Sequence, residues 1–385
     1  MKSSLFLTTL AYYNAYAFPG VDKLLHEFAR RQDAPQSRQM IGDLVKGATT
    51  EVGRRVRDCL LGDESCEVTR PLNSMACRRD TCCVWDYIQS DLTEILIEND
   101  GTCNRLARQA VRLGFHDAGA WSQTSRTGGA DGSLLLSSNE MSQSINNGMQ
   151  DIRDVGLEIL DRYQGFGISA GDLVQFMHNV AVVVCPLGPR ILTFIGRTDN
   201  DESPAGLLPT NNLSADRMIE VFANKTFGTR DLVAVVGAHT TAGQFFVDTN
   251  RAGAPLDTTP GVWDINYYRE VLTDSPPSNV FRLHGDDGMA RSVELNTFFQ
   301  TYAVWGNSSG PLFVFVITYY VRAYVRLSLL GVNNINDLID CTAVLPSAVT
   351  SSTTRPNNSD SDSGNAAYMV VKTTYVFPVI DCRSR

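Results

Sequence analysis

Histidine and tryptophan are scarce in this sequence of 385 residues, which contains five of the former and four of the latter. An excess of basic side chains is also missing, because 33 Lys and Arg stand against 42 Asp and Glu, for a net charge of −9. A mildly acidic chain offers no electrostatic reason to bind nucleic acid. Apolar types make up 43% and charged types 19%, as in ordinary core-forming proteins. Composition therefore excludes a disordered, collagen-like or multi-span membrane protein, and the length allows one large domain or two smaller ones.

One stretch, residues 311–332, resembles a membrane span by hydropathy alone. Arg322 and Arg326 lie inside it, four apart on one helical face, and Pro311 opens it. An arginine within the hydrocarbon of a bilayer is costly. We therefore expect a buried amphipathic helix here and no association with a membrane.

The first 17 residues have the features of a secretory signal peptide. Lys2 precedes an apolar stretch, and Ala15 and Ala17 form an A-x-A cleavage pattern; a short buried N-terminal helix is the alternative. Nine cysteines suit an oxidising compartment, and the Asn-x-Ser/Thr sequons are typical of a glycoprotein. We expect a secreted, extracellular protein. The sequons begin at Asn212, Asn224, Asn307 and Asn357.

The middle of the chain has mainly helical periodicity. Apolar residues recur at three- and four-residue spacing, and Ser169 is placed to cap one of the helices. The segments between are rich in Gly, Pro and Asn, and no repeat of 20–50 residues is visible. A mainly α fold with long loops and little β structure follows. The predicted helices include residues 90–97, 103–117, 147–163 and 170–184.

We expect residues 1–17 to be a signal peptide. The polar, low-complexity residues 348–385 are expected to form a flexible tail.

Arg112 and His116 lie four residues apart on a predicted helix, so they extend from the same face. Phe115 is placed to flank that face. The other positions of this helix are largely apolar, which indicates that the polar pair forms a site. A structural pair near a helix end is the alternative.

Hard oxygen ligands follow His116 directly. Asp117 is the next residue, and the segment GGADGS supplies Gly129, Asp131 and Ser133. Two carboxylates, a backbone carbonyl and a hydroxyl are ligands of the kind that calcium prefers. Taken alone, Asp131 is equally well explained as a turn residue.

A second histidine, His239, ends the apolar run DLVAVVGA and is also followed by hard oxygens. A lone histidine among apolar residues is more often a hydrogen-bonded core residue than a ligand. Two histidines, each followed by an oxygen cluster, are hard to attribute to coincidence. The second oxygen set consists of Thr240, Asp257, Thr259, the carbonyl of Val262, and Asp264.

Seven segments, in this order along residues 77–347, carry a resemblance to a known family. They are RLGFHDA, GGADGS, CPLGP, LVAVVGAHT, LDTTPGVWD, RLHGDDGMAR and LIDCTAVLP. Together they resemble the secreted heme peroxidases of the plant–fungal superfamily, above all the fungal class II group of lignin, manganese and versatile peroxidases. The resemblance implies a two-domain helical heme peroxidase domain over residues 77–347, with heme b between a distal half that ends near residue 190 and a proximal half. Residues 18–76 are then an N-terminal extension or propeptide. It also implies two calcium ions, hydrogen peroxide and small aromatic donors as substrates, and a monomer.

The resemblance assigns roles to the two histidines. His239 is the proximal iron ligand, and Asp286 accepts its other ring N–H, with Asp287 as the neighbouring alternative. His116 is the distal general base for peroxide, and Arg112 stabilises negative charge on the leaving oxygen.

Three further roles follow in the same way. Asn146 accepts a hydrogen bond from His116 and fixes its tautomer, with Asn147 one step away as the alternative. Phe115 flanks the heme. The two oxygen sets correspond to a distal and a proximal calcium site.

The resemblance also implies disulfides. The expected pairs are Cys77–Cys83, Cys82–Cys341 and Cys103–Cys185. Cys59–Cys66 is a further hypothesis from their spacing, which leaves Cys382 over.

Departures from the family concern the electron donor. The three carboxylate positions of a manganese site hold Arg105, Gln109 and Phe245, and the position of an exposed catalytic tryptophan holds Ala234. Trp121 and Trp263 are more simply explained as core or pocket residues. These departures favour a generic low-potential peroxidase that oxidises small phenols.

Two alternatives stay open. One is a class I-like peroxidase with another donor, against which the signal peptide, the cysteines and the calcium ligands argue. The other is a secreted, calcium-stabilised scaffold without heme, against which the joint presence of Arg112, His116, His239 and Asp286 argues.

Overall fold

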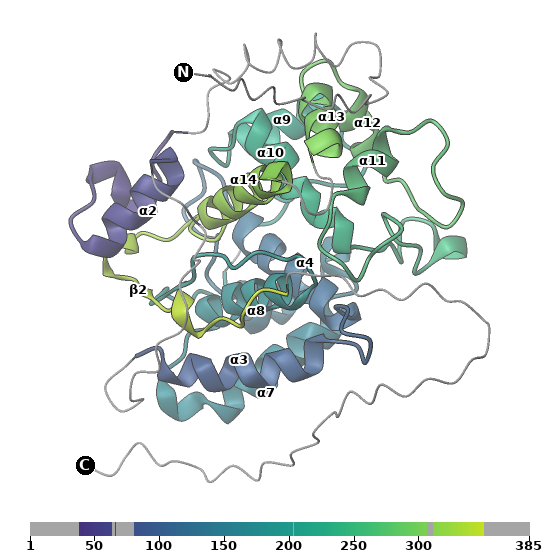
Figure 1. Cartoon of the computed structure of the whole chain (residues 1–385). Coiled ribbons are helices and arrows are strands. Elements are labelled where there is room, and N and C mark those ends of the chain that lie inside the picture. Colours follow the sequence, from purple (N-terminus) through teal and green to yellow (C-terminus); the bar gives the residue numbers. More distant parts are fainter. Residues whose placement is uncertain (1–37, 64–65, 67–80, 203, 306–310, 350–385) are drawn as a thin grey trace, which may run out of the picture.

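The structure is mainly helical, as predicted (Figure 1). Its described part contains one pair of strands, β1 (Phe194–Ile195) antiparallel to β2 (Ile339–Asp340). The expected signal peptide, most of the tail and Cys382 lie outside that part. The computed structural model describes residues 38–63, 66, 81–202, 204–305 and 311–349.

The α-helices of this part are α2 (Glu51–Leu61), α3 (Cys83–Leu96), α4 (Arg105–Gly119), α5 (Ser133–Leu136), α6 (Ser138–Met141), α7 (Gln150–Arg162), α8 (Ala170–Val184), α9 (Ala215–Ala223), α10 (Thr229–Val236), α11 (Asn266–Leu272), α12 (His284–Arg291), α13 (Asn296–Trp305) and α14 (Pro311–Leu327). The 3-10 helices are η1 (Gly42–Lys46), η3 (Ser144–Asn146), η4 (Gln164–Phe166), η5 (Gly237–Thr241), η6 (Thr249–Arg251), η7 (Ile335–Asp337) and η8 (Thr342–Val344).

Helices α3, α4, α7 and α8 form one group, and they cover the four segments predicted to be helical (lower half of Figure 1). The Ser169 side chain accepts from the backbone N–H of Asp172 at 3.0 Å, so the predicted cap of α8 is confirmed. Every residue of α8 is buried, as expected for a helix that is apolar on nearly all sides. Gly114 of α4 permits close packing, because a Cβ there would lie 2.4 Å from the Tyr324 hydroxyl.

Helices α9 to α13 form the second group, and α14 packs against α10, α13 and α2 (Figure 1). The buried amphipathic helix predicted near residue 311 is α14. Arg322 donates to the backbone carbonyl of Leu60, and Arg326 donates to the carbonyl of Gln39 at 2.7 Å. No helix among the described residues is long and apolar enough to span a membrane.

The second half of the N-terminal extension packs into the same core as α14. Val56, Cys59 and Leu60 of α2 are at most 1% exposed. The Asn336 side chain accepts from the backbone N–H of Thr49 at 2.8 Å, which joins this segment to η7. Residues 38–61 are therefore integrated with the folded domain.

Three of the expected disulfides are present. They are Cys59–Cys66, Cys82–Cys341 and Cys103–Cys185. Cys83 is also disulfide-bonded, while its expected partner Cys77 lies outside the described residues.

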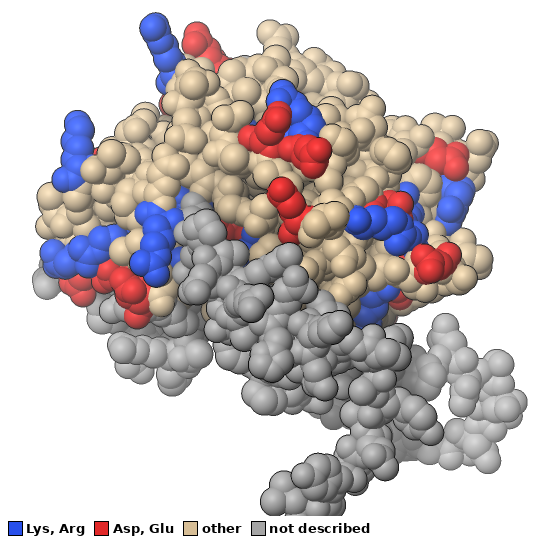
Figure 2. All heavy atoms as spheres, turned by 90° about the horizontal axis from the view of Figure 1, so that it is seen from above, with Lys and Arg blue, Asp and Glu red and all other residues tan. Residues whose placement is uncertain are grey.

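The surface carries charges of both signs. On the face shown in Figure 2, basic and acidic side chains lie close together in mixed groups, separated by uncharged surface. Asn212 and Asn224, which begin two of the sequons, are exposed; the other two sequons lie outside the described ranges.

Candidate active site

The distal part of the site is built on α4. Arg112 and His116 extend from one face of this helix, and Arg112 Nε donates to His116 Nε2 at 3.3 Å. His116 is 8% exposed, and burial, reinforced by the charge of Arg112, lowers its pKa to about 3. The ring of Phe115 lies edge-on to His116, with centroids 5.8 Å apart. The imidazole is therefore neutral and able to accept a proton over most of the pH range.

Asn146 fixes the tautomer of His116. Its amide N–H donates to the backbone carbonyl of Glu140 at 2.8 Å, so its oxygen faces His116 Nδ1 at 2.8 Å. Because that oxygen only accepts, Nδ1 carries the hydrogen. Arg112 only donates, so Nε2 must be the acceptor. Two independent contacts thus give the same tautomer, with the hydrogen on Nδ1 and the lone pair on Nε2, where it accepts from Arg112.

Backbone carbonyls hold the guanidinium of Arg112. Its terminal nitrogens donate to the carbonyls of Ile145 and Asn147, each at 2.7 Å. Burial lowers the Arg112 pKa to about 10, which leaves the group charged at neutral pH. Asn147, considered as the alternative to Asn146, thus contributes its backbone carbonyl rather than its side chain. Sequence reasoning missed these carbonyl contacts, because any residue type carries a carbonyl.

The proximal part of the site joins η5 to α12. His239 Nδ1 lies 2.8 Å from Asp286 Oδ2. The carboxylate only accepts, so Nδ1 donates, and a neutral His239 has its lone pair on Nε2. Burial lowers the pKa of His239, but the charge and hydrogen bond of Asp286 outweigh it, so the pKa is raised overall. Asp287 points elsewhere and pairs with Arg282 and Arg291 at 2.9 and 3.1 Å.

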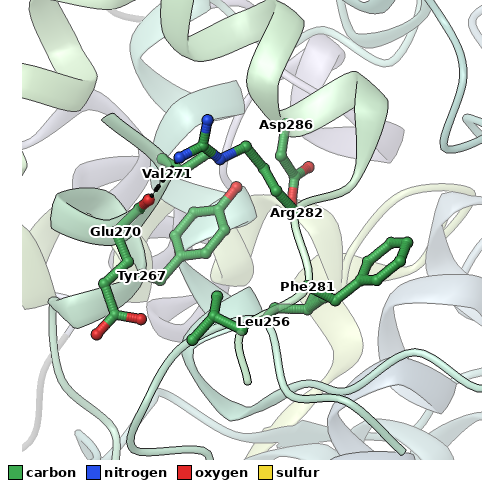
Figure 3. A pocket seen from close by; sticks show the side chains of 8 residues that line it. Leu256, Tyr267, Glu270, Val271, Phe281, Arg282 and Asp286 are labelled. Atoms are coloured by element: carbon green, nitrogen blue, oxygen red, sulfur yellow. Dashed lines mark hydrogen bonds between the residues drawn. The ribbon is translucent and has the colours of Figure 1, made fainter. Parts of the chain in front are cut away.

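A small hollow lies behind Asp286 (Figure 3). Its walls include Asp286, Arg282 and Tyr267, and the Tyr267 hydroxyl points toward the other two side chains. The Tyr267 ring meets His239 edge-on, with centroids 5.5 Å apart. His239 is therefore held by a carboxylate on one side and a ring on another.

The histidine geometry fits a heme iron ligand. His239 Nε2 has no hydrogen-bond partner among the residues the structure describes, and the side chain is 34% exposed. The charge of Arg112 also lowers the His239 pKa, so the distal and proximal groups lie within electrostatic range of each other. A neutral imidazole whose other nitrogen donates to a carboxylate is a common metal-ligand arrangement.

The first oxygen set gathers next to His116. Asp117 is fully buried and accepts from the backbone N–H groups of Gly132 and Leu134, while Asp131 accepts from that of Ser133. Burial, with the charge of Asp131, raises the Asp117 pKa well above its ordinary value. The Ser133 hydroxyl is buried and has no hydrogen-bond partner among the described residues. Gly129 belongs to the same turn, since its carbonyl accepts from Asp131 N–H at 2.9 Å.

The second oxygen set gathers next to His239. The Thr240 hydroxyl lies 2.6 Å from Asp257 and 3.2 Å from Asp264, and the Thr259 hydroxyl lies 2.8 Å from Asp264. Burial, with the charge of Asp264, raises the Asp257 pKa to about 8. Val262 lies in the same loop, with its N–H bonded to the Thr259 carbonyl at 2.9 Å.

The donor chemistry of both sets fits a hard cation. Buried carboxylate pairs with raised pKa values and a partnerless hydroxyl are expected where a bound cation supplies the compensating charge. No cluster of three or more His, Cys, Asp or Glu side chains fit for a metal occurs in the described part. Each set contains only two carboxylates, so hydroxyls and carbonyls would complete the coordination.

The three positions singled out for the electron donor also come together. Arg105 lies 3.1 Å from Asp151 Oδ2, and Gln109 donates to the same oxygen at 3.1 Å. The Arg105 guanidinium lies over the Phe245 ring, 5.2 Å from its centroid. A cation and an exposed aromatic ring therefore occupy this surface. Ala234 is buried.

Comparison with known proteins identifies the family of this chain. The family model described as "Peroxidase" matches residues 88–304, more than half of the chain. The chain belongs to the peroxidase family. A peroxidase of Arthromyces ramosus is 29% identical over 295 residues, covering 70% of this chain and 77% of the relative. Ligninase LG5 of Phanerodontia chrysosporium is 30% identical over 289 residues (69% and 75%), and manganese peroxidase H4 of the same organism is 32% identical over 294 residues (69% and 74%). The peroxidase family match covers both candidate histidines.

Proposed function

We propose that this peroxidase binds heme b between His116 and His239, reduces hydrogen peroxide, and oxidises small phenols in one-electron steps. The observation that carries the proposal is the pairing of two oriented imidazoles. His116 presents an unprotonated Nε2 beside Arg112, and His239 bonds to Asp286 through Nδ1, which leaves Nε2 as its nitrogen for a metal. Heme, when bound, would supply redox chemistry that stores the two oxidising equivalents of peroxide and passes them to donors one at a time.

The distal residues move a proton between the two oxygens of peroxide. His116 Nε2 accepts the proton of the nearer oxygen and returns it to the farther one as the O–O bond breaks. Arg112 stabilises the negative charge that develops on the leaving oxygen, because its charge is fixed in place by two carbonyls. The bond to Asn146 keeps Nδ1 protonated, so His116 neither rotates nor changes tautomer.

The proximal residues would hold the metal and tune its electron density. His239 would bind iron through Nε2, and Asp286 would make the imidazole a stronger donor by accepting its Nδ1–H. Calcium in each oxygen set would brace the adjacent histidine, because Asp117 and Thr240 are the chain neighbours of His116 and His239.

We further propose that the donor is a small phenol rather than manganese(II). The Arg105 charge repels a divalent cation, and Phe245 offers no ligand atom. The mature protein is proposed to be a secreted monomer that needs neither nucleic acid nor membrane.

The proposal is tested by the visible absorption of the purified protein and by its donor preference. We expect a Soret band that shifts when peroxide is added, and turnover of a simple phenol that far exceeds turnover of manganese(II) or veratryl alcohol. A folded protein without a Soret band would support the heme-free scaffold instead. Efficient manganese turnover would contradict the interpretation of Arg105, Gln109 and Phe245.

A further inference from the structure

Four tyrosine rings form a continuous series that starts at His239. The ring of Tyr267 lies 5.5 Å from that of His239, centroid to centroid, and the ring of Tyr268 lies 5.3 Å from Tyr267. Tyr302 follows at 5.2 Å from Tyr268, and Tyr319 at 5.8 Å from Tyr302. The series crosses three helices, since its members come from α11, α13 and α14.

The rings differ in burial along the series. Tyr267, Tyr268 and Tyr302 are at most 2% exposed, whereas Tyr319 is partly exposed. The series therefore leads from the proximal histidine to the protein surface. Ring contacts at each step give an electron a path without a gap filled by saturated side chains.

The hydroxyl groups determine where oxidation can stop. Those of Tyr267 and Tyr302 are buried without a hydrogen-bond partner in the described part of the chain, and that of Tyr268 donates to the Val233 carbonyl at 2.9 Å. A phenol that loses an electron must also lose its proton to form a stable neutral radical. The carboxylate of Asp286 lies beside Tyr267, but it also accepts from His239 Nδ1, so a proton taken from Tyr267 would weaken the hold of Asp286 on His239. Tyr319 can release its proton to water.

Arg230 assists this release. Its guanidinium lies 5.2 Å from the centroid of the Tyr319 ring. A fixed positive charge at this distance disfavours a radical cation relative to the neutral radical, so it favours proton loss as the electron leaves.

We propose that Tyr319 is a second oxidation site, for phenols too bulky to approach the heme, and that it is connected to the heme through Tyr302, Tyr268 and Tyr267. The inference rests on the proposed function, which supplies the oxidant. One electron passes from Tyr319 to the centre oxidised by peroxide, and the phenolic proton of Tyr319 passes to solvent. A donor phenol then returns one electron and one proton to Tyr319 and leaves as a phenoxyl radical. Two such cycles, with the two protons returned from solvent, reduce one hydrogen peroxide to two waters.

The test compares wild-type holoenzyme with Tyr319→Phe, which keeps the ring and removes the oxidisable hydroxyl. Tyr87→Phe is the matched control, because Tyr87 is 40% exposed on α3 and has no ring contact among the described residues. Each protein is treated with peroxide and a nitroso spin trap without donor, then digested and mapped by mass spectrometry. In parallel, turnover is measured with free guaiacol and with guaiacol coupled to polyethylene glycol.

We expect the wild type and Tyr87→Phe to carry the trap on Tyr319. In Tyr319→Phe, turnover of the polymer-linked guaiacol should fall about tenfold or more, while turnover of free guaiacol changes less than about twofold. Two results would overturn this inference and leave the proposed function intact. One is a wild-type protein that oxidises free guaiacol but carries no trap on Tyr319. The other is a Tyr319→Phe variant with unchanged turnover of the polymer-linked guaiacol. A wild type inactive toward free guaiacol would contradict the proposed function, and this inference with it.

Discussion

His116 Nδ1 lies 2.8 Å from the side-chain oxygen of Asn146, and this contact determines which nitrogen of His116 is free to act. The amide of Asn146 is itself held by the Glu140 carbonyl at 2.8 Å. The chemistry proposed at His116 Nε2 therefore depends on a residue that lies 30 positions away in the chain.

Removing the Asn146 oxygen should slow peroxide reduction. Asn146→Val should lower the rate of reaction with peroxide by about 10- to 100-fold, because His116 loses the contact that fixes its tautomer. Stopped-flow absorbance at the Soret band measures this rate. Asn147→Ala is the control, since Asn147 contributes its backbone carbonyl to Arg112. Equal effects of the two substitutions would contradict the assignment.

Asp286 and Asp287 provide a neighbouring pair for a second prediction. Asp286→Ala should raise the midpoint potential of the heme iron, because His239 loses its carboxylate partner and becomes a weaker donor. Asp287→Ala should leave the potential unchanged, since Asp287 pairs with Arg282 and Arg291 instead. Spectroelectrochemical titration compares them. A shift in Asp287→Ala alone would refute the role given to Asp286.

Removing calcium should make stability fall as pH rises. The pKa of Asp257 in the cation-free fold is raised to about 8 by burial, so the native state holds a proton that the unfolded chain releases near pH 4. The stabilisation from that proton is complete below about pH 4 and is lost as pH approaches 8. The melting temperature of chelated protein should therefore decrease from pH 5 to pH 8, and added calcium should restore it.

Asp257→Asn serves as the control for this trend. The amide cannot ionise, so the chelated variant should show a flatter decrease over the same pH interval. A melting temperature that chelation does not alter at any pH would argue against a cation at this site.

His178 should produce the opposite pH dependence. It is fully buried between Tyr320 and Tyr324, and burial lowers its pKa to about 3. Unfolded His178 binds a proton below about pH 6.5, whereas native His178 does not, so stability is lost as pH falls from 6.5 toward 3. The loss attributable to this group at pH 4 is on the order of 3 kcal/mol.

Urea unfolding at pH 7 and pH 4 tests this prediction. His178→Gln should be less stable than wild type at pH 7 and should lose less stability on acidification. A variant that loses as much stability as the wild type between these pH values would show that His178 does not carry the effect.

The sequence predicted the elements whose signals are local. The i, i+4 spacing of Arg112 and His116, the cap at Ser169 and the arginines of α14 are all visible in a short window of residues. The partners of the histidines are not local, since Asn146 and Asp286 were assigned only through a resemblance to a family. The carbonyls that hold Arg112 and the ring series from Tyr267 to Tyr319 depend on tertiary packing, which no local pattern encodes.

The most direct measurement is the heme content and peroxidase activity of His239→Ala, with His284→Ala as an exposed histidine control on α12. We predict that His239→Ala loses its bound chromophore or its turnover of a simple phenol, and that added imidazole restores part of that activity. His284→Ala should behave as wild type. A His239→Ala protein that keeps its Soret band and oxidises the phenol at the wild-type rate would contradict the role of His239 as iron ligand.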